Sequence, residues 1–411
     1  MSRILGLSAF HPDAAVAAVR DGEFVAGVEE ERFRRVKHWA GFPELALRWS
    51  ANELGGDAKD LAAVAVARQP RAYALRKAWL AVTHPRSLRR AVSRVKNLTA
   101  VSSLEGRVAG ALGLAKSPPI VPVEHHRAHL ASAFFCSPFE EAACLSVDGF
   151  GDFVSTMLAH GKGNRIEVLE RVHYPHSLGI FYSAMTQYLG FPNFGDEYKV
   201  MGLAAYGAPR LASEVAQLVP AVNDTVSGTF RLDLRYFRHL AEGVDMTWAS
   251  GQPSLGKLWT PAFAELLGPA RDPGEELTQR HMDLAASMQA IYEERFFALV
   301  RRVLARTGSK RLALAGGCAL NSLANGRIFD RTGVKEIFIQ SAAGDAGTSL
   351  GAALSVHHEF LGRPRTGFVM EHSSWGPRHG EQEVRAARGG DSAGERRGRS
   401  LREAGDRHRP G

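Results

Sequence analysis

The chain opens on apolar runs that are separated by short polar turns. Residues 4–10 read ILGLSAF, and two further apolar runs lie on either side of Asp21 and Gly22. An Asp-Gly pair between two apolar runs is the local signal of a β-hairpin turn, so the pattern predicts three successive strands. A helix is expected at 42–54, where Leu and Trp recur at helical spacing, and a strand at 61–67.

The same pattern restarts in the middle of the chain, after a helical stretch at about 71–115 and the short strand and helix start of PPIVPVEHH. From residue 143, ACLSVDGFGDFVSTMLAHGKGNRIEVLERV predicts three strands joined by tight turns. The elements expected after it are helices at 177–191 and 281–306, the strand RLALAGG, the helix NSLANGRIFDRTG, the strand EIFIQ and the helix TSLGAALSVHHEFL. This repetition predicts a duplicated α/β architecture with halves at 1–142 and 143–387.

Composition and charge narrow the class of protein. The 411 residues are 45% hydrophobic, which is enough for a sizeable core, and carry a formal net charge of +8. Much of the positive charge lies in 71–95, which we interpret as a solvated helix face rather than a nucleic-acid surface, and in 388–411. Because Leu401 is its only large apolar side chain, 388–411 is expected to be disordered.

The cysteines and the N-terminal residues indicate in which cellular compartment the protein is expected. Cys136, Cys144 and Cys318 match neither a disulfide framework nor a Cys-based zinc site, which indicates a reducing compartment. The first residues make a poor signal peptide, and no run of about 18 apolar residues exists. We therefore expect a cytoplasmic protein that contacts no membrane and has no nucleic-acid partner.

The segment VEHHRAHLASAF carries the sharpest chemical signal. His125 and His129 are spaced i, i+4, which on a helix places both imidazoles on one face. Asp148 ends the apolar strand ACLSVDG before a glycine. Two imidazoles and one carboxylate are a donor set typical of a divalent-metal site. The alternative is a pair of surface or capping histidines that bind nothing.

Two glycine-containing turns follow buried strands in the second half. Gly316 and Gly317 precede Asn321, and glycines there let a ligand approach the amides of a helix start, although an ordinary strand-to-helix turn has the same pattern. Asp345, in SAAGDAGTSLGAA, either caps the next helix or supplies a second carboxylate to the metal. His11 lies in the first turn, and the charged run GDEYKVMGLAAYG is either solvated surface or part of a site.

Together these segments resemble the NodU/CmcH-type O-carbamoyltransferases, which modify nodulation signals and natural products, antibiotics among them. The residues that carry the resemblance are FHPDAAVAAVRDGEFVAGVEEERFRRVKHWAGFP, HHRAHLASAF, SVDGFGD, GDEYKVMGLAAYG, AGGCALNSLANGRI and GDAGTSLGAA, and it covers about residues 3–387. The first domain of that family is similar to the threonylcarbamoyl-transferase domain of tRNA modification. The resemblance thus implies a duplicated actin-like, sugar-kinase-like (ribonuclease-H-like) fold with two α/β halves around a cleft.

The resemblance also assigns roles to single residues. It implies an iron(II)-type metal site at His125, His129, Asp148 and Asp345. His11 resembles the family's histidine beside the carbamoyl group. Because imidazole titrates near neutral pH, His11 is a candidate general base for the acceptor hydroxyl.

The remaining roles concern the acceptor and the nucleotide. Lys37 stands where acceptor contacts are expected, and Gly316, Gly317 and Asn321 look like part of the nucleotide cradle. The reaction implied has two stages. Carbamoyl phosphate and ATP first give carbamoyladenylate, and the hydroxyl of a small-molecule acceptor then attacks its carbonyl.

Members of that family continue into a second, YrdC-like domain that makes the adenylate, and its Arg-rich motif is not among these residues. We therefore expect a separate domain or chain to supply carbamoyladenylate, and no pyrophosphate release by this chain alone. Two other functions stay open: a folded metal-binding remnant without turnover, and an actin-like ATPase or sugar kinase. The identity of the acceptor and the oligomeric state are not indicated by the sequence.

Overall fold

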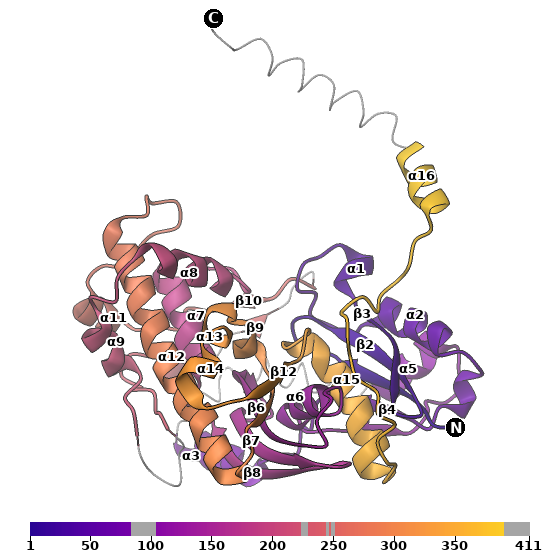
Figure 1. Cartoon of the computed structure of the whole chain (residues 1–411). Helices are drawn as coiled ribbons and strands as arrows, with labels where there is room; N and C mark the ends of the chain where they lie inside the picture. The colour runs from indigo at the N-terminus through magenta and orange to yellow at the C-terminus, as the bar shows by residue number, and fades with distance from the viewer. Residues whose placement is uncertain (84–103, 223–228, 244–245, 248–250, 390–411) are drawn as a thin grey trace, which may run out of the picture. The chain divides into compact units, whose positions relative to one another are not determined.

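The first half of the chain is built on one mixed sheet (Figure 1). The computed structural model describes residues 1–83, 104–222, 229–243, 246–247 and 251–389. Across this sheet the strands run in the order β3 (Glu23–Glu29), β2 (Ala15–Arg20), β1 (Arg3–Ser8), β4 (Ala63–Val66) and β5 (Ile120–Pro122). Strand β2 is antiparallel to β1 and β3, whereas β4 is parallel to β1 and β5.

The hairpin between β2 and β3 forms where the Asp-Gly pair predicts it. Asp21 and Gly22 both have positive φ angles, of 50° and 89°, which suit a two-residue turn between right-twisted strands. Buried and half-exposed positions alternate along β3, as expected of an edge strand, whereas β4 is buried throughout. The three opening strands and the strand at 61–67 are therefore confirmed.

The second half repeats this sheet. Its strands run in the order β8 (Arg165–His173), β7 (Val154–Lys162), β6 (Glu141–Gly151), β11 (Arg311–Ala315) and β12 (Glu336–Ile339). Strand β7 is antiparallel to both neighbours, and β6, β11 and β12 are parallel. Order and direction match the first sheet strand by strand, so the duplicated, ribonuclease-H-like α/β fold is confirmed.

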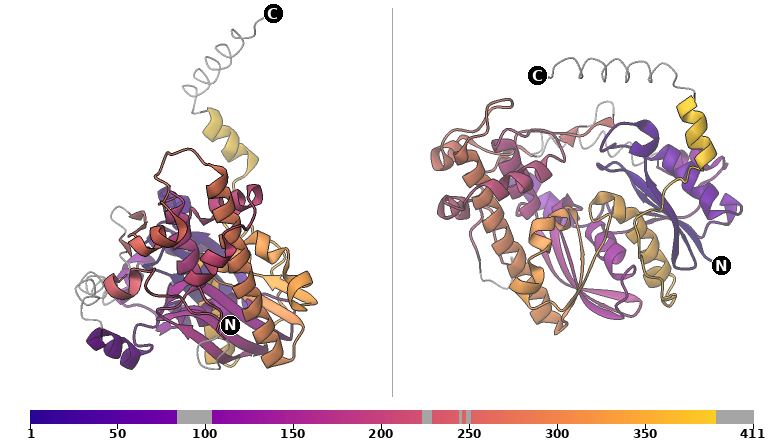
Figure 2. Two further views of the ribbon diagram at one scale, coloured as in Figure 1. Left: turned by 90° about the vertical axis from the view of Figure 1, so that its left-hand side faces the viewer. Right: turned by 45° about the horizontal axis from the view of Figure 1, so that its top comes forward.

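Two helices cross between the sheets (Figure 2). Helix α6 (His125–Phe134) follows the first sheet but packs on β6 and β11, and α15 (Asp345–Ser355) follows the second sheet but packs on β1 and β2. The two helices also contact each other, and nearly all their residues are buried. A Cβ atom on Gly351 would lie 1.7 Å from the Ala128 carbonyl oxygen, so this close approach requires a glycine.

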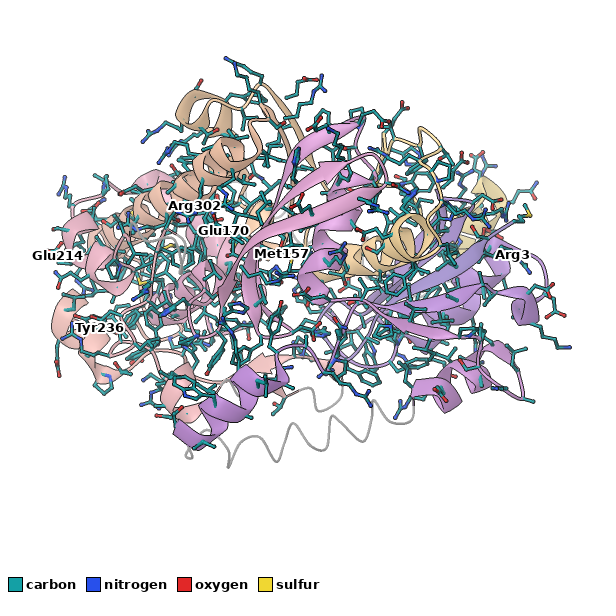
Figure 3. All side chains as sticks on the ribbon, turned by 90° about the horizontal axis from the view of Figure 1, so that it is seen from below. Arg3, Met157, Glu170, Glu214, Tyr236 and Arg302 are labelled. Atoms are coloured by element: carbon teal, nitrogen blue, oxygen red, sulfur yellow. The ribbon has the colours of Figure 1, made fainter. Side chains whose placement is uncertain are left out.

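Helices cover the outer face of the second sheet. The longest, α12 (Gln279–Thr307), begins at a capping box formed by Thr278 and His281, and it confirms the helix expected at 281–306. Arg302 of α12 donates to Glu170 of β8 over 2.6 Å (Figure 3). The other elements of this half are α7 (Leu178–Tyr188), α8 (Glu197–Leu203), η2 (Ala204–Tyr206), α9 (Ala212–Leu218), α10 (His239–Glu242), β9 (Met246–Thr247), β10 (Ser254–Leu255), α11 (Pro261–Leu267), η4 (Gly317–Leu320), α13 (Ser322–Asn325), α14 (Ile328–Thr332) and the π-helix η5 (Val356–Phe360).

The first half carries α1 (Glu31–Arg34), α2 (Glu44–Leu54), η1 (Ala58–Asp60), α3 (Ala74–Thr83) and α5 (Leu104–Leu112). Part of the helical stretch expected at about 71–115 lies outside the described residues, as does most of 388–411. The single helix expected from NSLANGRIFDRTG is wrong, because two short helices, α13 and α14, stand there with Gly326 between them.

Contacts group the chain into two units. Residues Met1–Ser374 form the first, which holds both sheets, and Trp375–Gly411 form the second, which holds α16 (Glu381–Gly389). The boundary between the two α/β halves stays a prediction. None of the helices in the described part of the chain combines the length and the apolarity that a membrane span needs.

Candidate metal centre

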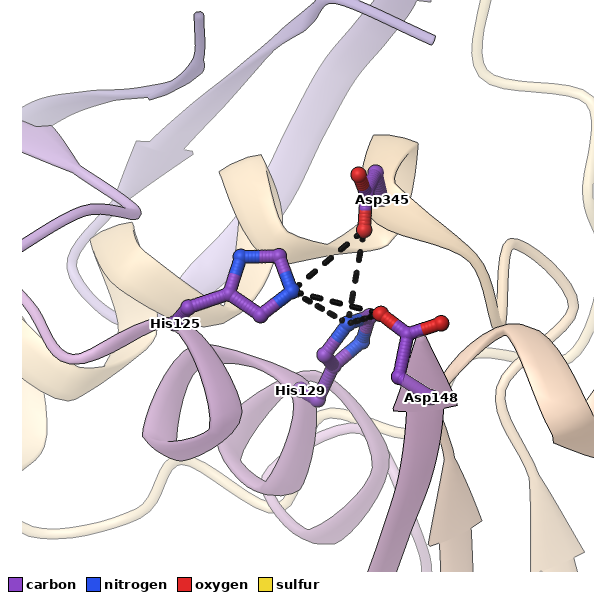
Figure 4. Close-up of side chains that lie close together, drawn as sticks. All are labelled: His125, His129, Asp148 and Asp345. Carbon is purple, nitrogen blue, oxygen red and sulfur yellow. Dashed lines mark hydrogen bonds and ion pairs between the residues drawn. The ribbon is translucent and has the colours of Figure 1, made fainter. Parts of the chain in front are cut away.

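Helix α6 presents two imidazoles to one point in space (Figure 4). His125 and His129 are both buried, and their Nε2 atoms lie 3.1 Å apart. The backbone amide of His125 donates to the Asp152 carboxylate over 3.0 Å, which ties the start of α6 to the turn after β6. His126 faces away, with its ring nitrogens 2.7 Å from Ser146 Oγ and 3.0 Å from the Val154 carbonyl oxygen.

Asp148 lies on β6 where regular pairing with β7 is interrupted after Val147. Its Oδ2 atom is 3.4 Å from His125 Nε2 and 3.3 Å from His129 Nε2. Its Oδ1 atom accepts a hydrogen bond of 3.0 Å from the Gly317 amide. The Gly317 amide therefore orients Oδ1, and Oδ2 faces the two imidazoles.

Asp345 completes the group from the first turn of α15. Its Oδ1 atom lies 3.4 Å from His125 Nε2 and 3.6 Å from His129 Nε2. One ligand atom from each of the four residues lies within 4.8 Å of all the others. The structure thus brings together the four residues for which the sequence and the resemblance predict a metal site.

These distances suit a first-row divalent metal. Tetrahedral ligands about 2.1 Å from a central ion are about 3.4 Å from one another, which is the spacing of imidazole and carboxylate ligands at zinc-type centres. Two imidazoles with two carboxylates favour iron, zinc or a similar ion, whereas Ca²⁺ and Mg²⁺ prefer oxygen ligands alone. The donor set and the spacing fit the implied metal.

Electrostatics at the four side chains also favour a cation. Burial disfavours the charged form of Asp148, but hydrogen bonds from His125 and His129 outweigh it and hold the pKa of Asp148 well below its usual value. Burial likewise opposes protonation of His125, yet the Asp345 and Asp148 carboxylates raise the pKa of His125 well above its usual value. Two largely buried carboxylates side by side thus favour a positive charge here, which a proton or a metal ion supplies.

His11 lies beside this group of four. Its ring centroid is 5.3 Å from that of His125, and its Nδ1 atom is 3.9 Å from Asp345 Oδ2. Burial lowers the pKa of His11 to about 3, although Asp345 acts in the opposite direction. The ring is therefore neutral at pH 7, and its buried Nε2 atom has no hydrogen-bond partner among the described residues.

Lys37 is exposed and has an aromatic neighbour that the sequence does not single out. Its Nζ atom lies 5.9 Å from the ring centroid of Tyr198, which belongs to α8. Lys199 Nζ lies at the same distance from that ring and is 2.6 Å from Asp196 Oδ1. The charged run GDEYKVMGLAAYG therefore supplies side chains next to Lys37 from the other half of the chain.

The residues predicted for the nucleotide are engaged inside the protein. Gly316 has a φ angle of 95° and donates its amide to the Ala343 carbonyl, and the Gly317 amide holds Asp148. Asn321 exchanges two side-chain hydrogen bonds of 3.0 Å with Gln289 and caps α13. Their nucleotide-binding role stays a prediction, and Gly317 has in addition a structural role beside the candidate metal ligand Asp148.

We expect Gly317→Ala to weaken metal binding. A Cβ atom at this position would lie 2.6 Å from Asp148 Oδ1, so the carboxylate has to move from its place opposite the imidazoles. Loss of such an outer contact typically costs about 10- to 100-fold in metal affinity. Competition of each protein with a fluorescent chelator measures the change. Unchanged affinity would show that the place of Asp148 does not depend on the space that Gly317 leaves free.

Comparisons with known proteins bear on the family of this chain. Residues 3–354 match the family model described as the carbamoyltransferase N-terminus. An uncharacterized protein of Synechocystis, sll1178, is 40% identical over 93% of this chain and 62% of its own length. Nodulation protein NolNO of Sinorhizobium fredii is 34% identical over 90% of this chain and 49% of its own length. The chain thus spans about half to two thirds of these relatives.

Among solved structures, component A of the (R)-2-hydroxyglutaryl-CoA dehydratase of Acidaminococcus fermentans covers 88% of this chain and all of its own, with 15% identity and a TM-score of 0.47. Because that score is below 0.5, the fold assignment rests on the strand order of the two sheets. The family match covers both sheets and all four residues of the candidate metal centre. The chain therefore belongs to the carbamoyltransferase family, and residues 3–354 match the N-terminal domain of that family.

Proposed function

We propose that this chain transfers a carbamoyl group from carbamoyladenylate to a hydroxyl group of a small-molecule natural product or sugar. The observation that carries the proposal is the convergence of His125, His129, Asp148 and Asp345, with His11 beside them. Iron(II) is the proposed metal, and the cytoplasm, where free thiols persist, is the proposed compartment. Cys136, Cys144 and Cys318 are all free cysteines in the structure, which agrees with that compartment.

The reaction requires few groups. The acceptor oxygen forms a bond to the carbamoyl carbon, the bond from that carbon to the phosphate oxygen breaks, and AMP leaves with the electron pair. A divalent ion held by His125, His129, Asp148 and Asp345 would supply Lewis acidity towards the carbonyl or phosphate oxygen. His11 is the proposed base for the proton of the hydroxyl: its ring is neutral, and the nearby Asp345 carboxylate stabilises the charged ring that forms, against the effect of burial.

Two further parts of the proposal concern binding. Lys37 is exposed within reach of Tyr198, which suits contacts with a polar acceptor. An adenylate is proposed near Gly316, Gly317 and Asn321, with its phosphate towards the metal ligands; the position of Gly317 next to Asp148 supports that direction. ATP and carbamoyl phosphate are the proposed sources of the adenylate, which a separate domain or chain would make.

The test supplies carbamoyladenylate directly. Purified protein loaded with iron(II) is mixed with carbamoyladenylate generated in situ and with a panel of acceptors: a sugar, an aminoglycoside, a macrolactam and a lipo-oligosaccharide. AMP release and a carbamoylated acceptor, detected by mass spectrometry, support the proposal. Absence of AMP release in every mixture, including those with water as the acceptor, would contradict it.

For His11→Ala we expect AMP release to slow by about 10²- to 10⁴-fold, because a positioned base contributes that much to a proton transfer. Metal content should not change, since His11 Nδ1 is 3.9 Å from Asp345 and the residue is outside the group of four. Elemental analysis and initial rates on the same preparation separate the two effects. A variant that loses its metal would make His11 a ligand instead of a base.

A further inference from the structure

His38 stands where three segments of the proposed site meet. Its Nδ1 atom is 2.7 Å from Asp13 Oδ1, in the loop that carries His11. Its backbone amide donates to Glu31 Oε2 over 2.7 Å, and Lys37 precedes it in the chain. The His38 ring also meets the ring of Phe194 edge-on at 5.3 Å, in the turn that leads into α8.

The backbone on both sides of this contact adopts unusual angles. Phe10, Asp13 and His38 have positive φ angles of 61°, 57° and 57°, a conformation that costs free energy in residues other than glycine. Two backbone hydrogen bonds, from Phe10 to Gly41 at 2.8 Å and from Ala14 to Trp39 at 2.9 Å, hold the two segments side by side. The Asp13–His38 pair adds a side-chain hydrogen bond between them.

The far side of the His38 ring is closed by the second half of the chain. Gly195 has a φ angle of 85°, and a Cβ atom there would lie 2.4 Å from His38 Nε2. That nitrogen is buried and has no hydrogen-bond partner in the described part of the chain. Because Nε2 faces Gly195, the ring is placed to support its neighbours rather than to touch a substrate.

We propose that His38, oriented by Asp13, is a positioning residue that sets the loop of His11 against the segment of Lys37 and against the turn before α8. The inference rests on the proposed function, because His11 and Lys37 are the residues it positions. A misplacement of about 1 Å in such a constellation can cost about 10²-fold in rate. His38 thus affects the reaction through the positions of His11 and Lys37.

The charges around His38 agree with this role. The hydrogen bond with Asp13 raises the pKa of His38, burial and Lys37 oppose the rise, and Glu31 adds to it. A raised pKa means that the ion pair stabilises the fold fully below the unfolded pKa of about 6.5 and that this stabilisation is lost as pH rises through the folded value. The substitution Asp13→Asn should therefore lower the free energy of unfolding more at acid pH, where His38 is charged, than at alkaline pH, where it is neutral.

The chain offers matched variants for the test. His38→Ala removes the contact with Asp13, whereas His38→Asn keeps an N–H donor near the position of Nδ1 and tolerates the left-handed angle. Gly195→Ala pushes on the ring from the opposite side. Gly106→Ala, at an exposed position of α5 with nothing within 4 Å of its added Cβ, is the control.

Three measurements on each variant decide the matter: hydrogen exchange of residues 9–14, metal content, and AMP release from supplied carbamoyladenylate with water as the acceptor. In His38→Ala and Gly195→Ala we expect faster exchange, unchanged metal and a kcat lower by about 10- to 100-fold, with His38→Asn within about threefold of the parent. Wild-type exchange and wild-type kcat in His38→Ala overturn the proposal, as does a loss of metal.

The parent chain and the variants together distinguish a failure of the His38 proposal from a failure of the proposed function. If the parent chain releases no AMP, the proposed function fails, and hydrogen exchange at residues 9–14 by itself decides whether His38 holds the loop. If the parent chain is active and His38→Asn is as slow as His38→Ala, the hydrogen bond with Asp13 is not what matters, and the proposal is overturned.

Discussion

Replacing His125 and His129 together by Ala is expected to reduce the bound metal from about one ion per chain to below about 0.1, and to abolish carbamoyl transfer. The two imidazoles are the nitrogen donors of the candidate centre; their Nε2 atoms are 3.1 Å apart, and both side chains are buried. Without them Asp148 and Asp345 remain as two carboxylates, which hold first-row metals weakly. Elemental analysis of protein purified without chelators measures the loss.

The matched control removes two histidines that lie elsewhere. His160 pairs with Glu141 at 2.8 Å, and His379 is 70% exposed beside Glu383, so His160→Ala with His379→Ala should keep the metal. Circular dichroism of both double variants checks that each is folded. Full metal content in the His125 and His129 double variant would place the metal site elsewhere in the chain.

The second large effect is expected from Gly351→Ala. The added Cβ atom would lie 1.7 Å from the Ala128 carbonyl oxygen and 2.8 Å from the Ser132 amide, both in α6. Helices α6 and α15 therefore have to move apart, and overpacking of this kind costs about 3 kcal/mol of the free energy of unfolding. Because α6 carries His125 and His129 while α15 carries Asp345, metal affinity should fall as well.

Urea denaturation of the metal-free protein measures the loss of stability. Gly110→Ala in α5 is the control, because nothing lies within 4 Å of its added Cβ. Replacing an exposed helical Gly by Ala stabilises by about 0.5–1 kcal/mol, so the two substitutions should act with opposite sign. Equal free energies of unfolding in the two variants would show that α6 and α15 do not need the glycine contact.

Local patterns predict those parts of the molecule that depend on neighbours in sequence. The turn at Asp21 and Gly22 follows from the need for positive φ angles in a two-residue hairpin. His125 and His129 share a face because a helix returns to the same side every 3.6 residues. The repeat of the strand pattern from residue 143 predicts the second sheet. Its first three strands pair as hairpins, which form between segments that are adjacent in the sequence.

Local patterns fail where a helix is interrupted or a polar group has a distant partner. Ser322–Asn325 and Ile328–Thr332 form two short helices where the periodicity predicts one. The sequence around Asn321 is typical of a ligand contact, yet its side-chain amide exchanges hydrogen bonds with Gln289 of α12. No pattern near Asn321 indicates that partner. The position of Tyr198 beside Lys37 is likewise invisible before the two halves are folded.

The sequence by itself determines the strands, the hairpins, the paired imidazoles of α6 and, through the family motifs, the identities of the four candidate ligands. Only the tertiary structure decides that Asp345 reaches His125 and His129, because α15 leaves its own sheet and packs on β1 and α6. That crossing depends on close backbone contact at Gly6 and Gly351, where a side chain would collide with the opposing helix or its carbonyl groups. Such contacts join residues far apart in the chain, so the periodicity of one segment holds no information about them.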